Sequence, residues 1–580
     1  MALRWTWLIA TVVALALAAP AVAATTTTPT AGTTTPGVAS ALPTISTQMD
    51  PNALTRPSSL DAKPPLHQLT GRQAQRIAEA VPKVVKERAK HDDTTVDVFQ
   101  KGQTRWQVSF YDADHHEIAQ VIIDDASGKV TEAWTGPQVA WTMARGYPGA
   151  FGRKAAAAYV WIPLLILFIV PFVDWRHPLR MRHLDLLMLC SLSVSLAFFS
   201  HGNLAWSVPT TYPPLLYLLG RLLWIGLRGR DLTPTRGFLR GGGRGVQWLA
   251  IATVFLVGFR IGLNLTDSNV IDVGYSGVIG ADKISHGTDL YGGWPNDNQH
   301  GDTYGPVNYL VYVPFEQIWP WHGAWDDLPA AHGAAVFFDL LCLGGLFWLG
   351  RRLRGPTLGI VLAYAWAAFP FTLFSLATNS NDALVAAFLI GALLVATSAP
   401  ARGVFAALAG LTKFAPLILA PLLATHGTAG RPWPQRVRST ALFCLAFAVT
   451  AAIALIPVWL QGDFRTIWDS TLGFQLDRGA PFSVWGYYGG LDGLQRAVQI
   501  ATVLFAIGAA FMRRRPDVIG LAAIAGAILL CLQLGMTYWF YLYIVWVVPF
   551  AFVAIFGRDA EPEAPAPERP APPQPVYVAT

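Results

Sequence analysis

Long apolar runs separated by short polar segments occupy most of the chain after residue 155. An apolar helix of about 20 residues spans the hydrocarbon core of a bilayer. Counting such runs predicts about 11 spans and one re-entrant segment. The pattern therefore predicts a polytopic all-α membrane protein, with a small α+β domain outside the membrane near its N-terminus.

The first 24 residues have the pattern of a secretory signal peptide. Arg4 is followed by the apolar stretch 8–19 and by the small residues Ala21-Val22-Ala23, which are typical of a cleavage site. An uncleaved anchor helix is the alternative, and either one places the next segment outside the cytoplasm. Residues 25–64 are rich in Thr, Pro and Ala, so we expect a disordered linker there.

A small extracytoplasmic domain is predicted over residues 65–136. Helical spacing of apolar positions predicts one helix over residues 68–91. Alternating apolar and polar positions predict antiparallel strands over 96–99, 104–111, 117–124 and 130–134. Together with the sequence VIIDDASGKVTEAW, this arrangement resembles a PepSY-type domain of the bacterial cell envelope.

Composition and charge agree with the membrane interpretation. Hydrophobic residues make up 53% of the chain and charged residues 13%, and the mean hydropathy is +0.39. The net charge of +6 does not indicate nucleic-acid binding, because Lys and Arg cluster in short loops between spans, as membrane orientation requires. These basic loops are predicted to be cytoplasmic. The polar loop of residues 267–304 is then expected outside. The Pro-rich tail 557–580 is expected to be a disordered cytoplasmic segment, and the expected location of the protein is the bacterial inner membrane.

One apolar segment, residues 403–426, does not fit this alternation. If it crossed the membrane fully, the basic sequence RPWPQRVR that follows would face outside. We therefore predict a re-entrant segment, broken at Lys413-Phe414-Ala415-Pro416. Broken backbone at membrane depth needs protein or water around it, and an intramembrane lysine indicates a functional site. The alternative role for Lys413 is to reach the interface or to pair with an acid such as Asp339.

The outer loop of residues 267–304 carries candidate chemistry. Asp267 and Asp272 follow the apolar run 246–265, and His286 and Tyr291 come later in the same loop. A carboxylate just outside a bilayer is suited to act as a general base at a lipid–water boundary.

Four segments in this order resemble the GT-C superfamily of integral-membrane glycosyltransferases. Within it, they are similar to the bacterial polyprenyl-phosphate-mannose-dependent alpha-(1,2)-mannosyltransferases. The similarity covers residues 246–556 and leaves three accessory transmembrane helices in residues 155–245. The segments are Asp272–Tyr291, Tyr304-Gly305-Pro306-Val307, Asn379–Leu393 and Gly410–Pro416.

The resemblance implies transfer of a sugar from a polyprenyl-phosphate donor to an extracytoplasmic acceptor hydroxyl with inversion, and mannose is the sugar expected from the family it points to. Asp272 is the expected general base, and Asp267 is the second candidate. A glycolipid, a polysaccharide or a protein is the expected acceptor, with no metal or other cofactor. The mid-span Asp339 is expected to hold a cation in place. The residues expected to bind the donor are Lys413, Arg260, Arg478, His286, Tyr291 and Tyr304.

Two other classes of function fit parts of the sequence. A transporter or flippase for lipid-linked saccharides would also use broken helices and intramembrane charges. The restriction of long polar loops to the outer face, with no inverted repeat, favours an enzyme instead. An envelope sensor or scaffold would use the exported domain, but the segment after residue 556 is short and Pro-rich, which does not favour signalling.

Overall fold

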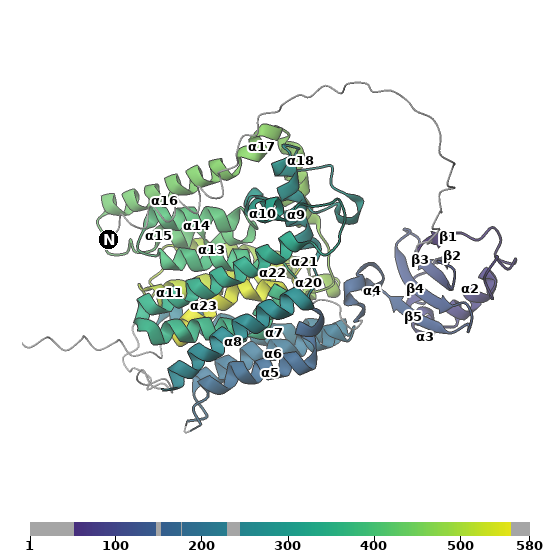
Figure 1. Ribbon diagram of the computed structural model, residues 1–580, viewed down its shortest axis with the longest axis horizontal. Coiled ribbons are helices and arrows are strands. Elements are labelled where there is room, and N and C mark those ends of the chain that lie inside the picture. The colour runs from purple at the N-terminus through teal and green to yellow at the C-terminus, as the bar shows by residue number, and fades with distance from the viewer. Residues whose placement is uncertain (1–51, 147–151, 176, 229–243, 558–580) are drawn as a thin grey trace, which may run out of the picture. The chain divides into compact units, whose positions relative to one another are not determined.

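The computed structural model describes residues 52–146, 152–175, 177–228 and 244–557 (Figure 1). The chain divides into two compact units. The small unit ends at Tyr147 and includes Ser200–Gly202, and the rest forms the large unit. The predicted signal peptide and all but the first residue of the predicted tail lie outside the described residues.

The small unit is built on a five-stranded antiparallel sheet whose strands follow one another in chain order. Cross-strand pairing aligns Val98 with Val108 and Val108 with Val121, so these buried side chains share one face. Helices α2 (Gly71–Glu79) and α3 (Pro82–Arg88) cover that face and bury Ala and Val side chains against it. The strands are β1 (Leu54–Thr55), β2 (Thr95–Lys101), β3 (Arg105–Tyr111), β4 (Glu117–Asp124) and β5 (Val130–Thr135).

Two expectations for this region were wrong. The single helix expected over residues 68–91 is two helices, because Pro82 lacks an N–H donor and begins a new helix. The segment expected to be a linker up to residue 64 contains β1, whose Leu54 and Thr55 pair with Lys101 and Gln100. Strand β1 is held by its backbone pairing with β2. Amino-acid composition does not indicate such pairing, so the strand could not be predicted from it.

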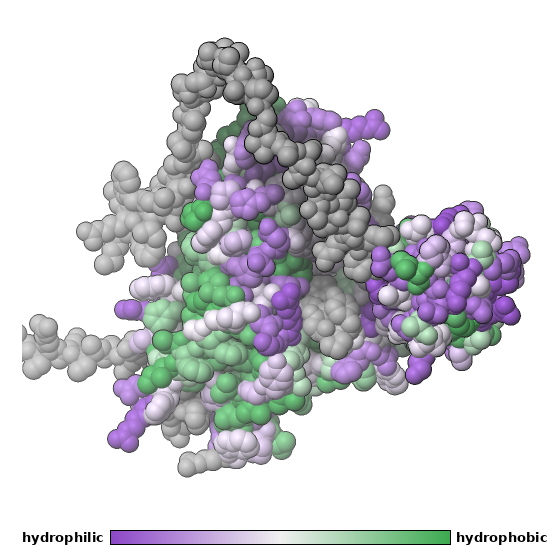
Figure 2. All heavy atoms as spheres, turned by 45° about the vertical axis from the view of Figure 1, so that its right-hand side comes forward, coloured by the Kyte–Doolittle hydropathy of each residue, from purple (hydrophilic) through white to green (hydrophobic). Residues whose placement is uncertain are grey.

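The large unit is helical, and its long helices run side by side (Figure 1). Among the described residues, five helices are long and apolar enough to cross a membrane: α6, α8, α11, α16 and α22. Hydrophobic residues are prominent on the face of this unit seen in Figure 2, whereas the small unit has a mostly hydrophilic surface. The helices are α5 (Ala158–Ile169), α6 (Met181–Ser200), α7 (Leu204–Leu227), α8 (Arg244–Thr266), α9 (Asp272–Ser285), α10 (Pro306–Ile318), α11 (Pro329–Ala368), α12 (Pro370–Ala377), α13 (Asp382–Leu394), α14 (Ala399–Gly410), α15 (Ala420–Thr425), α16 (Trp433–Ala454), α17 (Ile456–Gln461), α18 (Phe464–Trp468), α19 (Phe474–Asp477), α20 (Val484–Tyr487), α21 (Asp492–Gly508), α22 (Val518–Gly535) and α23 (Ile544–Phe556).

Helix α11 consists of two helices joined by a sharp turn. Arg354 and Gly355 have non-helical backbone angles, and Gly355 has φ +82°. A Cβ built on Gly350 would lie 2.7 Å from the backbone of Gly359, so the chain reverses direction between these two glycines. The turn falls in the basic sequence RRLRG, where the charge pattern separates two spans.

The segment expected to be re-entrant is a broken hairpin. Helix α14 ends at Gly410, and the chain continues through residues 411–414 into the 3₁₀ turn η5 (Ala415–Leu419) and α15. Arg402, near the start of α14, donates from Nε to Leu423 O at 2.8 Å and from Nη2 to His426 O at 2.9 Å. The end of the segment therefore returns to its beginning, and Lys413 lies at the tip.

Segments expected outside the membrane contact one another. Gln461 Nε2 donates to Tyr291 O at 2.7 Å, and the Ser483 hydroxyl donates to Thr537 O at 2.7 Å. The tip of the broken hairpin joins them, because Gly305 N donates to Thr412 O at 3.3 Å. These contacts agree with a common side for the loops, while the orientation across a membrane stays a prediction.

Candidate functional site

The loop before α9 and the loop between α12 and α13 are joined by backbone hydrogen bonds. Asn269 N donates to Ala377 O at 3.1 Å, and Ile271 N donates to Thr378 O at 3.2 Å. Asn379, with φ +51°, donates from Nδ2 to Asn269 O at 3.0 Å. The first loop leads into Asp272 and the second into Asp382, so this pairing fixes the two carboxylates relative to each other.

Asp272 is the first residue of α9, where the helix dipole favours negative charge. Its side chain is open to solvent, although Ile271 and Val273 on either side are buried. The surrounding protein raises the pKa of Asp272 by desolvation, and the positive charges of Arg478 and Lys413 oppose that rise. The surroundings of this carboxylate, which water reaches and on which the charges of Arg478 and Lys413 act, define the candidate recess.

Lys413 lies in a buried ion pair beside the recess. Its Nζ is 2.6 Å from Asp382 Oδ1, which also accepts a hydrogen bond from Trp546 Nε1 at 2.9 Å. The ammonium faces the rings of Tyr304, Tyr543 and Trp546, with centroids 5.5, 5.5 and 5.3 Å away. The alternative, that Lys413 pairs with an acid, is therefore confirmed, although its partner is Asp382 and not Asp339.

Arg478 supplies the second cation. Its guanidinium carbon lies 3.8 Å from the centroid of the Tyr538 ring, and its charge acts on both Asp272 and Tyr304. Arg478 directly follows α19, and Tyr538 lies in the loop after α22. Five separate segments of the chain thus contribute Asp272, Tyr304, Lys413, Arg478 and Tyr538.

Two of the predicted tyrosines are linked through the backbone. The Tyr291 hydroxyl donates to Tyr304 O at 2.9 Å, and Tyr304 precedes the Gly305 that binds the hairpin tip. Tyr304 faces Lys413 with its ring, whereas the hydroxyl of buried Tyr291 is used to hold the loop. Tyr304 therefore belongs to the recess and Tyr291 supports it.

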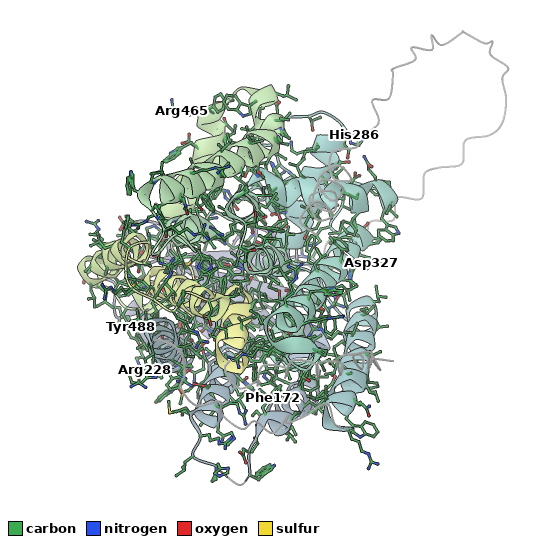
Figure 3. All side chains as sticks on the ribbon, turned by 90° about the vertical axis from the view of Figure 1, so that its left-hand side faces the viewer. Phe172, Arg228, His286, Asp327, Arg465 and Tyr488 are labelled. Atoms are coloured by element: carbon green, nitrogen blue, oxygen red, sulfur yellow. The ribbon has the colours of Figure 1, made fainter. Side chains whose placement is uncertain are left out.

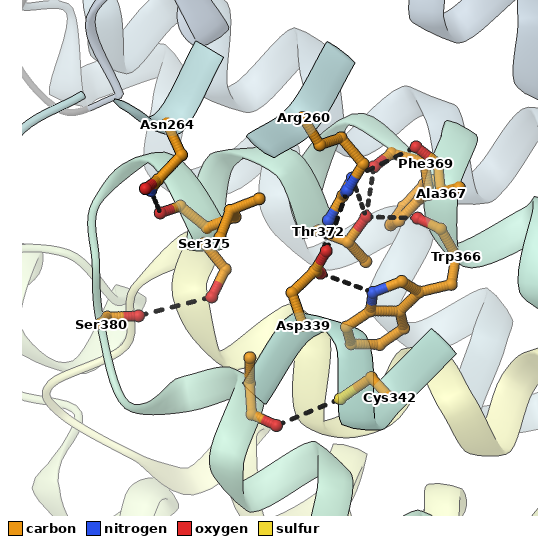
Figure 4. Close-up of polar contacts among 12 residues, drawn as sticks. Arg260, Asn264, Asp339, Cys342, Trp366, Ala367, Phe369, Thr372, Ser375 and Ser380 are labelled. Atoms are coloured by element: carbon orange, nitrogen blue, oxygen red, sulfur yellow. Dashed lines mark hydrogen bonds and ion pairs between the residues drawn. The ribbon is translucent and has the colours of Figure 1, made fainter. Parts of the chain in front are cut away.

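Arg260 does not contribute to the recess. It is fully buried on α8, and its guanidinium makes a two-bond contact with Asp339, from Nε to Oδ2 at 3.1 Å and from Nη2 to Oδ1 at 2.5 Å (Figure 4). Nη1 donates to Ala367 O at 3.2 Å and to Thr372 Oγ1 at 3.1 Å. The expectation of phosphate binding by Arg260 is corrected, since its donors are committed, while Asp339 holds a cation in place as expected.

Asp267 and His286 also lie apart from the recess. Asp267 is 2.6 Å from Lys154 Nζ, and the hydrogen bond from this ammonium lowers the pKa of Asp267. His286 is exposed at the end of α9, and its Nδ1 lies 3.0 Å from Asp282 O (Figure 3). The carboxylate paired with Lys154 is a weaker base than Asp272, and His286 is placed as a surface residue.

Sequence analysis missed Asp382, Tyr538, Tyr543 and Trp546. Asp382 follows the uncharged polar residues Thr378–Asn381 and opens an apolar helix, so a charge at the head of a span was the available indication. The aromatic residues could not be distinguished from an interfacial belt. Among the described residues, no three His, Cys, Asp or Glu side chains gather as a metal site would require.

The arrangement combines one solvent-accessible carboxylate with two cations held by aromatic rings. Such a site can accept a proton at Asp272 while Arg478 and Lys413 stabilise negative charge developing nearby. In comparisons with known proteins, no family model and no curated protein matches the chain.

Proposed function

We propose that this protein is a membrane glycosyltransferase that moves a sugar from a polyprenyl-phosphate donor to an acceptor hydroxyl. The proposal is carried by the position of Asp272, which water reaches and on which the positive charges of Arg478 and Lys413 both act, with Lys413 against the ring of Tyr304. A transfer reaction with an anionic leaving group uses a base to take the proton of the acceptor hydroxyl and cations to stabilise the departing phosphate.

The reaction follows from these groups. The acceptor oxygen attacks C1 of the donor sugar, and its proton passes to the Asp272 carboxylate as the new C1–O bond forms. The bond between C1 and the phosphate oxygen breaks, and the electron pair leaves with the polyprenyl phosphate. Arg478 and Lys413 stabilise that phosphate, and attack on the face opposite the leaving group inverts C1. Asp272 then releases the proton to water.

Sugar transfer by the purified protein in lipid tests the proposal. The assay supplies radiolabelled polyprenyl-phosphate mannose and a membrane glycolipid extract, and compares wild type with Asp272→Asn. We expect transfer to fall at least a hundredfold in the variant, because general-base catalysis contributes about 10²–10⁴ in rate. The amide is nearly isosteric with the carboxylate, so the fold is retained.

Asp267→Asn is the matched control, since Asp267 precedes Asp272 by five residues and is tied to Lys154. Its transfer rate should stay within a few-fold of wild type. Equal activity of Asp272→Asn and wild type would remove Asp272 as the base. Translocation of a lipid-linked saccharide without transfer, unaffected by Asp272→Asn, would instead establish the transporter alternative.

A further inference from the structure

Two adjoining cavities lie in the large unit, at residues that hydrogen bonds connect to the loop before Asp272. A cavity of about 440 Å³ is lined by the end of α8 and the start of α11, including Arg153, Asn264, Trp319, Asp327 and His332. A cavity of about 350 Å³ shares Trp319 and Asp327 with it. Volumes of this size suit a small ligand.

The walls of these cavities combine aromatic faces with polar groups. Trp319 is 43% exposed, and Trp321, His322 and Asp326 line the second cavity. Tryptophan offers a broad apolar face, against which the C–H side of a pyranose ring can pack. Asp, His and Arg supply acceptors and donors for hydroxyl groups.

The charged side chains that line these cavities indicate which class of ligand they can bind. Asp326 and Asp327 are exposed at the rim, and Figure 3 shows Asp327 at the edge of the large unit. Two carboxylates repel a phosphate headgroup, whereas hydroxyl groups can donate to them. The mixture of Arg153 and His332 with these acids therefore favours a neutral saccharide over an anion.

The cavity walls are connected to the loop that carries Asp272. His332 Nδ1 lies 3.1 Å from Asn264 Oδ1, and Asn264 Nδ2 donates to Asn379 Oδ1 at 2.8 Å. Asn379 in turn holds Asn269. On the other side, Trp325 Nε1 donates to Val270 O at 3.0 Å. The first cavity is thus linked through Asn379 to Asn269, and Trp325, which precedes Asp326 of the second cavity, contacts Val270, two or three positions before the candidate base.

Strained backbone is concentrated here. Of the five non-glycine residues with positive φ in the described part of the chain, Arg153 and Leu328 line the cavities and Asn379 belongs to the connecting network. Left-handed conformations at such residues cost free energy and are retained where the surroundings fix them, commonly at ligand sites. Leu328 is also 98% buried, with 2% of its surface exposed.

We infer that these joined cavities bind the acceptor as a neutral oligosaccharide, stacked on Trp319 and hydrogen-bonded by Asp327. The inference rests on the proposed function in one respect: the bound saccharide is an acceptor only if the protein transfers a sugar. Saccharide binding itself requires no transfer, so the two can fail separately.

Binding of fluorescein-labelled mannotetraose to the full chain in lipid nanodiscs tests the inference, with unlabelled maltotetraose and cellotetraose as competitors. We expect binding at millimolar or tighter affinity, weakened at least tenfold in Trp319→Ala and in Asp327→Ala. Gly333→Val is a second route to the same result, because a Cβ at Gly333 would lie 2.8 Å from the Trp319 ring and displace it. Trp248→Ala is the control, since Trp248 is an exposed tryptophan on α8 outside both cavities.

Asp272→Asn should bind the labelled saccharide as wild type does. Saccharide binding without transfer by wild type would sink the proposed function and leave this inference standing. Absence of binding by any of the three tetrasaccharides would overturn the inference. It would equally be overturned by unchanged binding in all three cavity variants, or by full displacement with phosphatidylglycerol vesicles, which would assign the cavities to lipid.

Discussion

At the scale of single residues, the candidate site depends on the balance of charge around Asp272. Protein burial holds the pKa of Asp272 above its ordinary value of 3.8, while Arg478 and Lys413 limit the rise. A general base works only when deprotonated. Transfer should therefore decline as pH falls through this raised pKa, so that the acidic limb of the pH–rate profile lies above 3.8.

Replacing Arg478 by Gln should move that acidic limb to higher pH. The guanidinium favours the ionised carboxylate, and its removal leaves desolvation less opposed. The pH dependence of kcat/KM checks this shift, because it reports the free enzyme. Arg478→Lys keeps the charge and should keep the limb near its wild-type position. A limb that stays in place in Arg478→Gln would show that another group titrates.

The ion pair between Lys413 and Asp382 predicts a stability effect. Lys413→Met leaves the buried Asp382 carboxylate without its cation, so we expect a loss of about 3–5 kcal/mol in the free energy of unfolding. The double variant Lys413→Met/Asp382→Asn should recover part of this loss, since no unpaired buried charge remains. Thermal unfolding in detergent measures both, and additive losses would contradict a coupled pair.

At the scale of elements, the contact between the broken hairpin and the start of α10 fixes the position of Lys413 in the candidate site. A Cβ at Gly305 would lie 2.0 Å from Leu411 O, so Gly305→Ala must push α10 and the hairpin tip apart. We expect transfer to fall at least tenfold with little loss of helical content by circular dichroism. Gly344→Ala on α11 is the control, because nothing lies within 4 Å of a Cβ there. Equal activity of the two variants would show that the tip contact is dispensable.

Breaks and turns between helices could be predicted from the sequence, whereas the partners of buried charges could not. The break near Lys413 and the turn at Arg354-Gly355 follow from the alternation of apolar runs and basic loops, which is a constraint along the chain. The roles of Arg260 and Asp382 could not be assigned, because both are charged residues in apolar helices and only tertiary packing decides their partners. In the structure Arg260 pairs with Asp339, and Lys413 pairs with Asp382. The position of Arg260 near the outer end of its span had instead suggested that it binds the donor phosphate.

At the scale of the whole molecule, the two units have separate cores. In the small unit, Asp125 is a buried carboxylate that accepts hydrogen bonds from Trp106 Nε1 at 2.7 Å and from Leu69 N at 3.0 Å. Burial opposes the ionisation of Asp125, but the backbone donors of Leu69 and Gln68, with Trp106, hold its pKa below 3.8. These bonds join the segment before α2 to the sheet.

We therefore expect residues 52–146 to fold alone and to lose stability in acid. Because the folded-state pKa of Asp125 is depressed, its contribution is complete above pH 3.8 and is lost as pH falls through the folded pKa. Asp125→Ala should cost about 1–3 kcal/mol at neutral pH by leaving buried donors unpaired, and the variant should lose less than wild type on acidification. Urea unfolding of the isolated unit, followed by tryptophan fluorescence at several pH values, measures both effects. Asp114→Ala, at the exposed β3–β4 turn, is the control, and an equal acid loss in wild type and Asp125→Ala would assign the pH dependence to other carboxylates.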